Sequence, residues 1–454
     1  CGDSNYDYIA DVNNDKVVDV LDYTTIINKS DDAEWCTTTY LVPKNPCEEA
    51  IPVETQDQID IIVDSNTYSN LESEINRFKE DIERDTGYRV KILADDWAKP
   101  SQVRNVLVDD FTNNLIGAIL VGDIPITYHV TEYLGQRYPS TPSDYYYQRL
   151  KDKDWFEETE DTIFQNLDQR NRYSRDIWTG RLLPPGNNFD EKINLLRKYF
   201  NRNHDYRIGK INYDGMLFVE SDEKVYEDGN IAEELNEQMS KVATYTGLYA
   251  DPSKVEVAYA LDHEERKNSI LNKISNNYEI MSINIHGAPT YQAVGGNVNI
   301  NKNDIINHPP GSLFVAIESC SNGDIRSKEY FAGWYLFSGN SLLVRANSVI
   351  TFYVGFQFNN LDIFDEYKLV ANGVDFGTIY KNSNGGQQSL LLGDPTLTIR
   401  EKDLENGPRI DDAVKTIDLG DIDVALIERG DVLATVEIKN IGKSKLELTD
   451  YTFG

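Results

Sequence analysis

Short apolar runs alternate with amphipathic stretches over most of this chain, and that alternation limits the fold more than any other feature. The run IDIIV at 59–63 is typical of a buried strand, and the stretch after it has an apolar helical face: Leu71, Ile75, Phe78 and Ile82. A capping box of Ser69 with Glu72 is expected to begin that helix, and Gly87 to end it. Repeated signals of this kind predict an α/β fold with a mainly parallel sheet covered by helices on both faces.

The alternation continues to the run LLLGDPTLTIR, which closes this body at 390–400. Further strands are expected at 89–93, 117–123, 176–181, 215–221, 255–260, 279–285, 312–318 and within 342–354. Further helices are expected at 102–111, 190–201, 231–245 and 328–338. The segment from Tyr128 to Arg175 is rich in tyrosine and has no clean period, so we expect long surface excursions there.

These signals divide the chain into four parts. An N-terminal segment, 1–50, carries a calcium-loop pattern, and two side-by-side α/β subdomains follow at 51–204 and 205–403. The last part, 404–454, contains the runs VLATVEIKN and KLELTDYTF, which alternate without helix signals. Such a pattern predicts the opening strands of an Ig-like β-sandwich.

The charge balance excludes several kinds of partner. The chain has 44 lysines and arginines against 76 aspartates and glutamates, a formal net charge of −32. Such a field repels phosphate backbones, so nucleic acid is not an expected partner. The sequence has no apolar run of about 18 residues, so no transmembrane segment is expected.

The segment DVNNDKVVDVLD at 11–22 has the spacing of a calcium loop, with oxygen ligands at positions 1, 3, 5, 7, 9 and 12. The ligands would be Asp11, Asn13, Asp15, the carbonyl of Val17, Asp19 and Asp22. This segment resembles the loop of dockerin modules, which implies a structural calcium ion and a dockerin-type protein partner. Lys16 stands where such loops have Gly, and a solvated acidic turn is the alternative.

The cysteines bear on the compartment. Pairing of Cys36 with Cys47 would close a short loop and imply an oxidising compartment, leaving Cys320 alone in the body. Cys1 followed by Gly is how a lipid-anchored bacterial protein begins after signal removal, and it is equally what an arbitrary sequence boundary would give. We expect an extracellular or cell-surface protein.

Two residues at strand ends form a candidate catalytic pair. His286 directly follows one apolar strand, and Cys320 directly follows another. Carboxyl ends of parallel strands share one edge of a sheet, so both side chains are expected there. An imidazole can activate a thiol as nucleophile, and the N–H groups of Gly287 and Cys320 could hold an oxyanion. The alternative is that Cys320 is buried filler and His286 a strand-end residue without a catalytic role.

Over residues 57–400 the sequence resembles the gingipain family of cysteine peptidases, in the caspase-like clan. The resemblance rests on IHG at 285–287, SC-x-NG at 319–323, LLGDPTL at 391–397, LVGDIP at 120–125 and the strand DIWTGR. It implies Cys320 as nucleophile and His286 as its proton-handling partner. It also implies Asp176, one methylene shorter than the family's Glu, as the acid that orients His286. The family's preference for a basic residue before the cleaved bond implies Asp190 as an acidic wall.

We therefore predict an extracellular cysteine endopeptidase that works through an acyl-enzyme and cleaves after Arg or Lys. One alternative is a sortase-like surface transpeptidase of the same fold, and another is a non-catalytic surface binding module. A zinc-protease helix is excluded because Lys267 stands where its second His would be. His129, His204 and His308 are expected at the surface, and Trp178 and Trp334 in the core.

Overall fold

The computed structural model describes most of the stretch between residues 56 and 399. The described residues are 56–133, 136–151, 156–160, 163–166, 175–220, 255–258, 260, 262–350, 369, 373–383 and 389–399, which belong to the unit formed by residues 51–400. The predicted calcium loop, the first three cysteines, the helix expected at 231–245 and the β-sandwich expected at 404–454 lie outside these residues.

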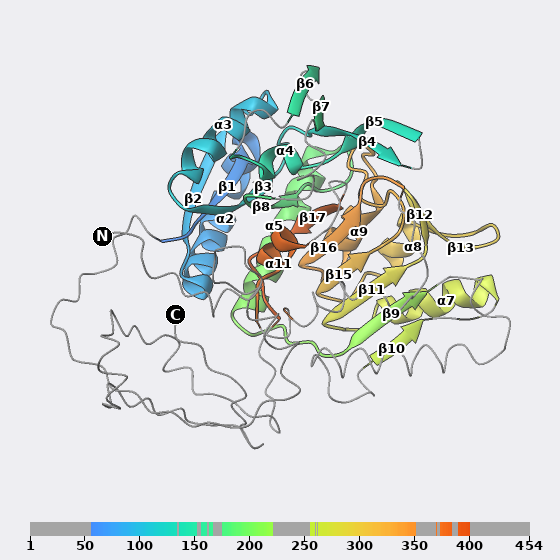
Figure 1. The fold of residues 1–454 in the computed structure, drawn as a ribbon. Helices are drawn as coiled ribbons and strands as arrows, with labels where there is room; N and C mark the ends of the chain where they lie inside the picture. The colour runs from blue at the N-terminus through green and yellow to red at the C-terminus, as the bar shows by residue number, and fades with distance from the viewer. Residues whose placement is uncertain are drawn as a thin grey trace, which may run out of the picture. The chain divides into compact units, whose positions relative to one another are not determined.

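A ten-stranded sheet runs through the described residues, in the order β10-β9-β11-β15-β16-β17-β8-β3-β1-β2 (Figure 1). Its strands are β1 (Gln58–Asp64), β2 (Arg89–Asp95), β3 (Leu115–Val121), β8 (Trp178–Leu182), β9 (Met216–Glu220), β10 (Val255–Ala258), β11 (Ile280–Asn284), β15 (Phe314–Ile317), β16 (Leu343–Asn347) and β17 (Ser389–Gly393). Each described pairing in it is parallel except that of β16 with β17. The predicted α/β fold with a mainly parallel sheet is confirmed.

Strands β1, β2, β3 and β8 form the first half of this sheet, and β9, β10, β11, β15, β16 and β17 form the second. Helices cover both faces of the first half. Alternate residues of β1 point to opposite faces, so Ile61 packs in one core with α2 (Ser65–Thr86) and Ile62 in another with α3 (Pro100–Phe111). The remaining described helices are α4 (Tyr145–Gln148), α5 (Phe189–Arg207), α7 (His263–Ile274), α8 (Lys302–Asn307), α9 (Phe331–Ser338) and α11 (Phe376–Asn382).

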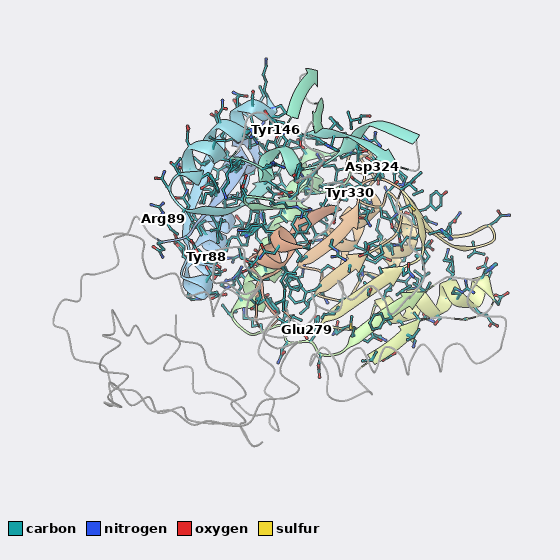
Figure 2. The ribbon with its side chains drawn as sticks, viewed as in Figure 1. Tyr88, Arg89, Tyr146, Glu279, Asp324 and Tyr330 are labelled. Carbon is teal, nitrogen blue, oxygen red and sulfur yellow. The ribbon has the colours of Figure 1, made fainter. Side chains whose placement is uncertain are left out.

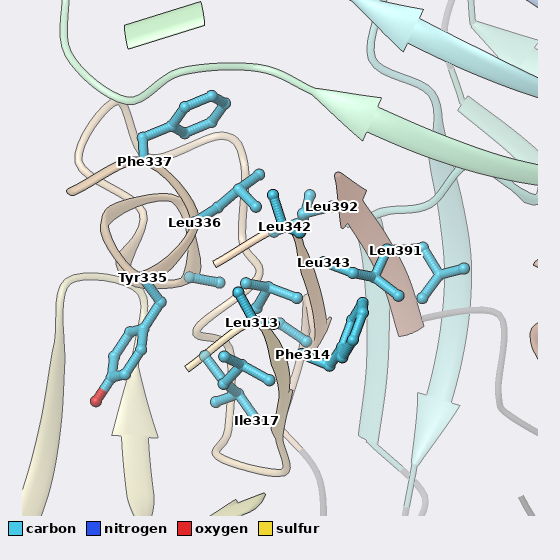
Figure 3. Close-up of a cluster of buried hydrophobic side chains, with 14 of the residues drawn as sticks. Leu313, Phe314, Ile317, Tyr335, Leu336, Phe337, Leu342, Leu343, Leu391 and Leu392 are labelled. Atoms are coloured by element: carbon cyan, nitrogen blue, oxygen red, sulfur yellow. The ribbon is translucent and has the colours of Figure 1, made fainter. Parts of the chain in front are cut away.

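The core of the second half lies between α9 and the neighbouring strands. Figure 3 shows Leu336 of α9 beside Leu342, with Leu343, Leu391 and Phe314 on the adjoining strands and Phe337 on α9. All of these side chains are buried, and they belong to the same apolar cluster as Trp178 of β8. The two halves of the sheet therefore share one core, and Trp178 lies in the core as predicted.

The buried side chain of Arg181 joins two of the sequence motifs, DIWTGR and LVGDIP. Arg181, the last residue of DIWTGR, pairs with Asp144 at 2.6 Å, and both side chains are buried. Its guanidinium also donates to the carbonyl of Ile124, in the motif LVGDIP, at 3.0 Å. The motifs thus fix the loop after β3 to strand β8.

Two small sheets were not expected from the sequence. One contains β12 (His286–Ala288), β13 (Tyr291–Gly295) and β14 (Val298–Asn301). The other contains β4 (Tyr128–Tyr133), β5 (Gln136–Pro142), β6 (Phe156–Glu160) and β7 (Ile163–Asn166). The second sheet and the buried helix α4 correct the expectation of surface excursions between Tyr128 and Arg175.

The start of α2 also differs from the expected one. The helix begins at Ser65, because Asp64 accepts the N–H of Thr67 at 2.9 Å and caps the first turn. The Ser69 hydroxyl instead donates to the carbonyl of Ser65 within the helix. Gly87 ends the helix as expected, with a φ of 72°.

Candidate active site

His286 and Cys320 leave two neighbouring strands at the same level of the sheet. Strands β11 and β15 are adjacent and parallel, with Ile283 opposite Ile317, and each candidate residue stands three positions beyond its member of that pair. The Glu318 N–H donates to the carbonyl of Ile283 at 2.9 Å, so the pairing extends past β15. The structure therefore brings both residues to one edge, with His286 exposed and Cys320 partly buried.

Gly287 lies directly against the backbone of Cys320. A Cβ atom at position 287 would lie 2.7 Å from the Cys320 carbonyl oxygen and 2.7 Å from Cβ of Ser319. Both distances are shorter than packed carbon atoms allow, so only Gly lets the strand that carries His286 approach this closely. The glycine of the motif IHG thus sets how near the two candidate catalytic residues can lie.

A strained turn presents Cys320. Ser321, the next residue, has a φ of 54°, a left-handed value that costs a non-glycine residue about 1 kcal/mol. Its N–H donates to the carbonyl of Val349 at 3.0 Å, and the Gly323 N–H donates to the carbonyl of Asn347 at 2.8 Å. The end of β16 therefore holds the turn in a conformation that a free chain would rarely adopt.

The segment after Cys320 leads to a pocket of about 530 Å³. Ile325 and Tyr330 line it, together with Trp97, Tyr128 and Leu183. The Tyr330 hydroxyl donates to the carbonyl of Leu183, so this wall is tied to the end of β8. Asp324 and Tyr330 lie on the same side of the molecule (Figure 2). The pocket thus spans the two halves of the sheet beside the turn that carries Cys320.

Asp190, the predicted acidic wall, lies exposed in the first turn of α5. Gly186 and Lys192, on either side of it in sequence, line the pocket, but Asp190 is not among the lining residues. The carboxylate in the lining is that of Asp123, which pairs with Lys192 at 3.0 Å. In this structure the pocket therefore presents a neutralised carboxylate.

Asp176, the predicted orienting acid, stands before β8, at the opposite end of that strand from Leu183. Its Oδ2 atom accepts the N–H groups of Leu150 at 2.6 Å and Lys151 at 2.9 Å. Strands β15, β16 and β17 separate β8 from β11, which corresponds to about 19 Å at the usual strand spacing. The structure does not bring Asp176 to His286, and the geometry gives it a structural role in holding the chain after α4.

Three buried residues that the sequence analysis did not single out lie behind the pair: Gln292, Asn322 and Tyr335. Gln292 is hydrogen-bonded to both Asn322 and Tyr335, and Asn322 donates to the carbonyl of Ala288, so the three residues connect the strand that carries His286 with the turn after Cys320. The position of Asn322 in SC-x-NG was a usable signal. No sequence pattern points to Gln292 or Tyr335, because their hydrogen-bond partners come from other elements.

The other histidines differ in burial. His129 was expected at the surface but is buried, and burial lowers its pKa to about 4. His204 is partly exposed, with its Nδ1 atom 2.7 Å from Oδ2 of Asp81. His308 is partly buried, with its Nδ1 atom 3.1 Å from the carbonyl oxygen of Asp304.

The residues that the structure describes contain neither a candidate metal cluster nor a candidate membrane-spanning helix. Within them, no group of three or more His, Cys, Asp or Glu side chains could hold a metal ion. None of the helices described there is long and apolar enough to cross a bilayer.

A mainly parallel α/β sheet covered by helices is consistent with a caspase-like fold, and a histidine and a cysteine at adjoining strand ends form a candidate catalytic pair in it. The chain belongs to peptidase family C25, the gingipain family, whose model matches residues 54–400. It is therefore a cysteine peptidase, and proteins or peptides are its substrates. No curated protein matches the chain.

Proposed function

We propose that this protein is an extracellular endopeptidase in which Cys320 is the nucleophile and His286 its proton-handling partner. The observation that carries the proposal is the equal register of the two residues beyond adjoining parallel strands. The close approach of Gly287 to the Cys320 carbonyl supports it, because it places the two backbones in contact.

The reaction follows from this pair. The imidazole of His286 takes the proton of the Cys320 thiol, and the sulfur attacks the scissile carbonyl carbon. The peptide C–N bond then breaks, the leaving amine takes the proton from the imidazolium, and a thioester remains on Cys320. Water, losing a proton to the imidazole, attacks the thioester carbon, and the thiolate leaves and is reprotonated. These steps return both side chains to their starting states.

We assign the oxyanion contacts to the N–H groups of Gly287 and Cys320. A two-residue turn joins β12 to β13, and Ala288 with Tyr291 is the pair next to it. The pair that closes such a turn normally exchanges both hydrogen bonds, so the following pair, Gly287 with Gln292, exchanges none. This register directs the Gly287 N–H away from β13, where a substrate oxygen can accept it.

Cleavage after Arg or Lys is a further part of the proposal. A basic substrate side chain needs a carboxylate, and Asp190 is an exposed one, with pocket-lining residues on either side of it in sequence. The carboxylate of Asp123 is already paired with Lys192. Hydrolysis of a peptide panel that varies only the residue before the cleaved bond tests this preference, and Asp190→Asn should lower kcat/KM for Arg and Lys peptides selectively.

A structural calcium ion in the loop at 11–22 and a dockerin-type partner for that segment also remain proposals. Titration of the metal-free protein with calcium, followed by calorimetry, tests the first. Loss of the heat signal in Asp15→Asn would support the assigned ligands, and an unchanged titration would contradict them.

The decisive experiment for the proposed function compares peptide hydrolysis by the wild type, Cys320→Ala and His286→Ala. Both variants should lose at least 10³-fold in kcat, since residues of a catalytic pair act as a unit. Product analysis with and without an added amine distinguishes hydrolysis from transfer to the amine. Full activity of Cys320→Ala would refute the assignment.

A further inference from the structure

We propose that Gln292 is a positioning residue, which holds the strand that carries His286 against the turn that carries Cys320. The inference deepens the proposed function and rests on it. It concerns a side chain that contacts neither the substrate nor the reacting atoms in the mechanism above, and acts through its hydrogen-bond partners.

The need for such a residue follows from the fold. His286 is the first residue of β12, which belongs to the small sheet β12-β13-β14 and not to the ten-stranded sheet. Cys320 lies on a turn anchored to the end of β16. The two candidate catalytic residues therefore stand just beyond the paired strands β11 and β15, on segments that belong to different local structures, and contacts between these segments help to set their separation.

Gln292 joins them from a fully buried position. It stands on β13 opposite Gly287, and its relative exposure is 0%. Its Nε2 atom donates to Oδ1 of Asn322 at 3.0 Å and, more weakly, to the Ser319 hydroxyl at 3.4 Å. Asn322 and Ser319 are the residues two after and one before Cys320. A single amide therefore contacts both sides of the Cys320 turn.

The orientation of each amide in this network is determined. Asn322 Nδ2 donates to the carbonyls of Ala288 at 2.6 Å and Tyr291 at 3.1 Å, which are acceptors only. Its Oδ1 must then accept, so Nε2 of Gln292 must donate, and Oε1 of Gln292 faces Tyr335 as an acceptor. The Tyr335 hydroxyl fills that position as donor at 2.9 Å. One consistent arrangement therefore satisfies all three side chains.

The network also stays neutral over the working range of pH. Two of its members are amides, which do not titrate, and burial raises the pKa of Tyr335 above its usual value. Tyr335 is fixed in α9, where its ring packs edge-on against Phe331 at 5.6 Å between centroids. The network of Gln292, Asn322 and Tyr335 therefore keeps the same hydrogen bonds while the catalytic pair changes its protonation.

The test replaces this amide and compares it with a matched one elsewhere. Gln292→Met keeps the volume but leaves Asn322 and Tyr335 without their partner. Gln148→Met is the control, because Gln148 is also buried, at 2% exposure, and its amide nitrogen and oxygen also both have side-chain partners, Thr179 at 2.7 Å and Arg175 at 3.0 Å. We expect both substitutions to lower Tm.

Only Gln292→Met should lower kcat, by about 10- to 100-fold with KM changed less than about twofold, since a displacement of about 1 Å can cost 10²-fold. Tyr335→Phe removes one hydroxyl and keeps the ring, so it serves if Gln292→Met does not fold, with an expected loss of about 3- to 10-fold. Equal kcat in the wild type and in whichever of these two variants folds would overturn the inference.

A second measurement separates this inference from the proposed function. Iodoacetamide labelling of Cys320, followed by mass spectrometry against pH, needs no peptidase substrate. An activated thiol reacts well below the range near pH 8.5 where free cysteine ionises. If the wild type labels only in that higher range, the proposed function fails. If the wild type labels at low pH and Gln292→Met does so equally, only the positioning role fails.

Discussion

Arg207 and Asp394 form a buried ion pair at 2.8 Å that joins α5 to the turn after β17. Asn203 and Thr396 donate to the same carboxylate, from α5 and from the turn itself. The ion pair with Arg207 explains why the motif LLGDPTL contains an acid. The carboxylate of Asp394 accepts hydrogen bonds from two residues of α5, the helix that follows β8.

Removing the cation of this pair should be costly. Arg207→Met leaves the Asp394 carboxylate buried with neutral donors only, and breaking a buried pair in this way typically costs about 3–5 kcal/mol. Urea unfolding measures the change. The control is Arg197→Met, which breaks the partly exposed pair with Glu74, a kind of pair worth about 0–1 kcal/mol. Equal losses in the two variants would contradict the account.

Gly287→Ala tests the close approach of the candidate catalytic backbones. The added methyl group would lie 2.7 Å from the Cys320 carbonyl oxygen, so β12 must shift. We expect a loss of at least about 10²-fold in kcat, in line with the effect of about 1 Å of misplacement. Gly87→Ala is the control. It places an alanine at a left-handed φ of 72°, where nothing lies within 4 Å of the added methyl group, so it should cost about 1 kcal/mol without changing kcat. Wild-type kcat in Gly287→Ala would refute the argument.

The stability of the first half should depend on pH through Asp60. This buried carboxyl lies near Asp110, and burial together with that negative charge raises its pKa to about 7. The folded state therefore holds a proton that the unfolded state releases near pH 4, so this contribution to stability is fully present below pH 4 and is lost as pH rises to about 7. Asp60→Asn should remove this slope. Urea midpoints at several pH values measure it, and a slope unchanged in the variant would be the contrary result.

His129 should give the opposite dependence. Burial lowers its pKa to about 4, so the unfolded state binds more protons between pH 6.5 and pH 4. Its contribution is present above pH 6.5 and is lost as pH falls toward 4. His129→Phe should be less sensitive to acid over that interval, as followed by thermal unfolding. A variant that loses stability as steeply as the wild type would show that His129 is not the group responsible.

Asp176→Asn separates an orienting role from a structural one. The carboxylate accepts two backbone N–H groups, so the substitution should cost about 1–2 kcal/mol of stability. Because the structure places Asp176 away from His286, kcat and its pH profile should stay unchanged at temperatures where the variant is folded. A large fall in kcat at normal stability would restore the orienting role.

Periodic features were predictable from the sequence, and features that depend on distant partners were not. Strand β1 and the apolar face of α2 follow from local patterns, as does the position of Cys320 after a strand. The start of α2 was misplaced because Asp64, on the preceding strand, caps the helix before Ser69 can. The small sheet beginning at His286 was missed because its strands are short and polar.

The tyrosine-rich segment was misread for a similar reason. The backbone carbonyls of Tyr146 and Arg149 are satisfied by Arg104, more than forty positions earlier in the sequence, which allows helix α4 to be buried. Asp176 was assigned by its place in a strand motif, and its actual partners, Leu150 and Lys151, lie in a loop with no pattern of its own.

The most direct test of the catalytic assignment is covalent labelling by a peptidyl chloromethyl ketone, located by mass spectrometry. The reagent places its ketone carbonyl where the scissile carbonyl would lie and its alkylating CH2 carbon next to it, so labelling needs the bound geometry as well as the thiol. We predict a single adduct on Cys320, formed at least about 10²-fold more slowly in His286→Ala. An adduct on another residue, or an equal rate in His286→Ala, would contradict it.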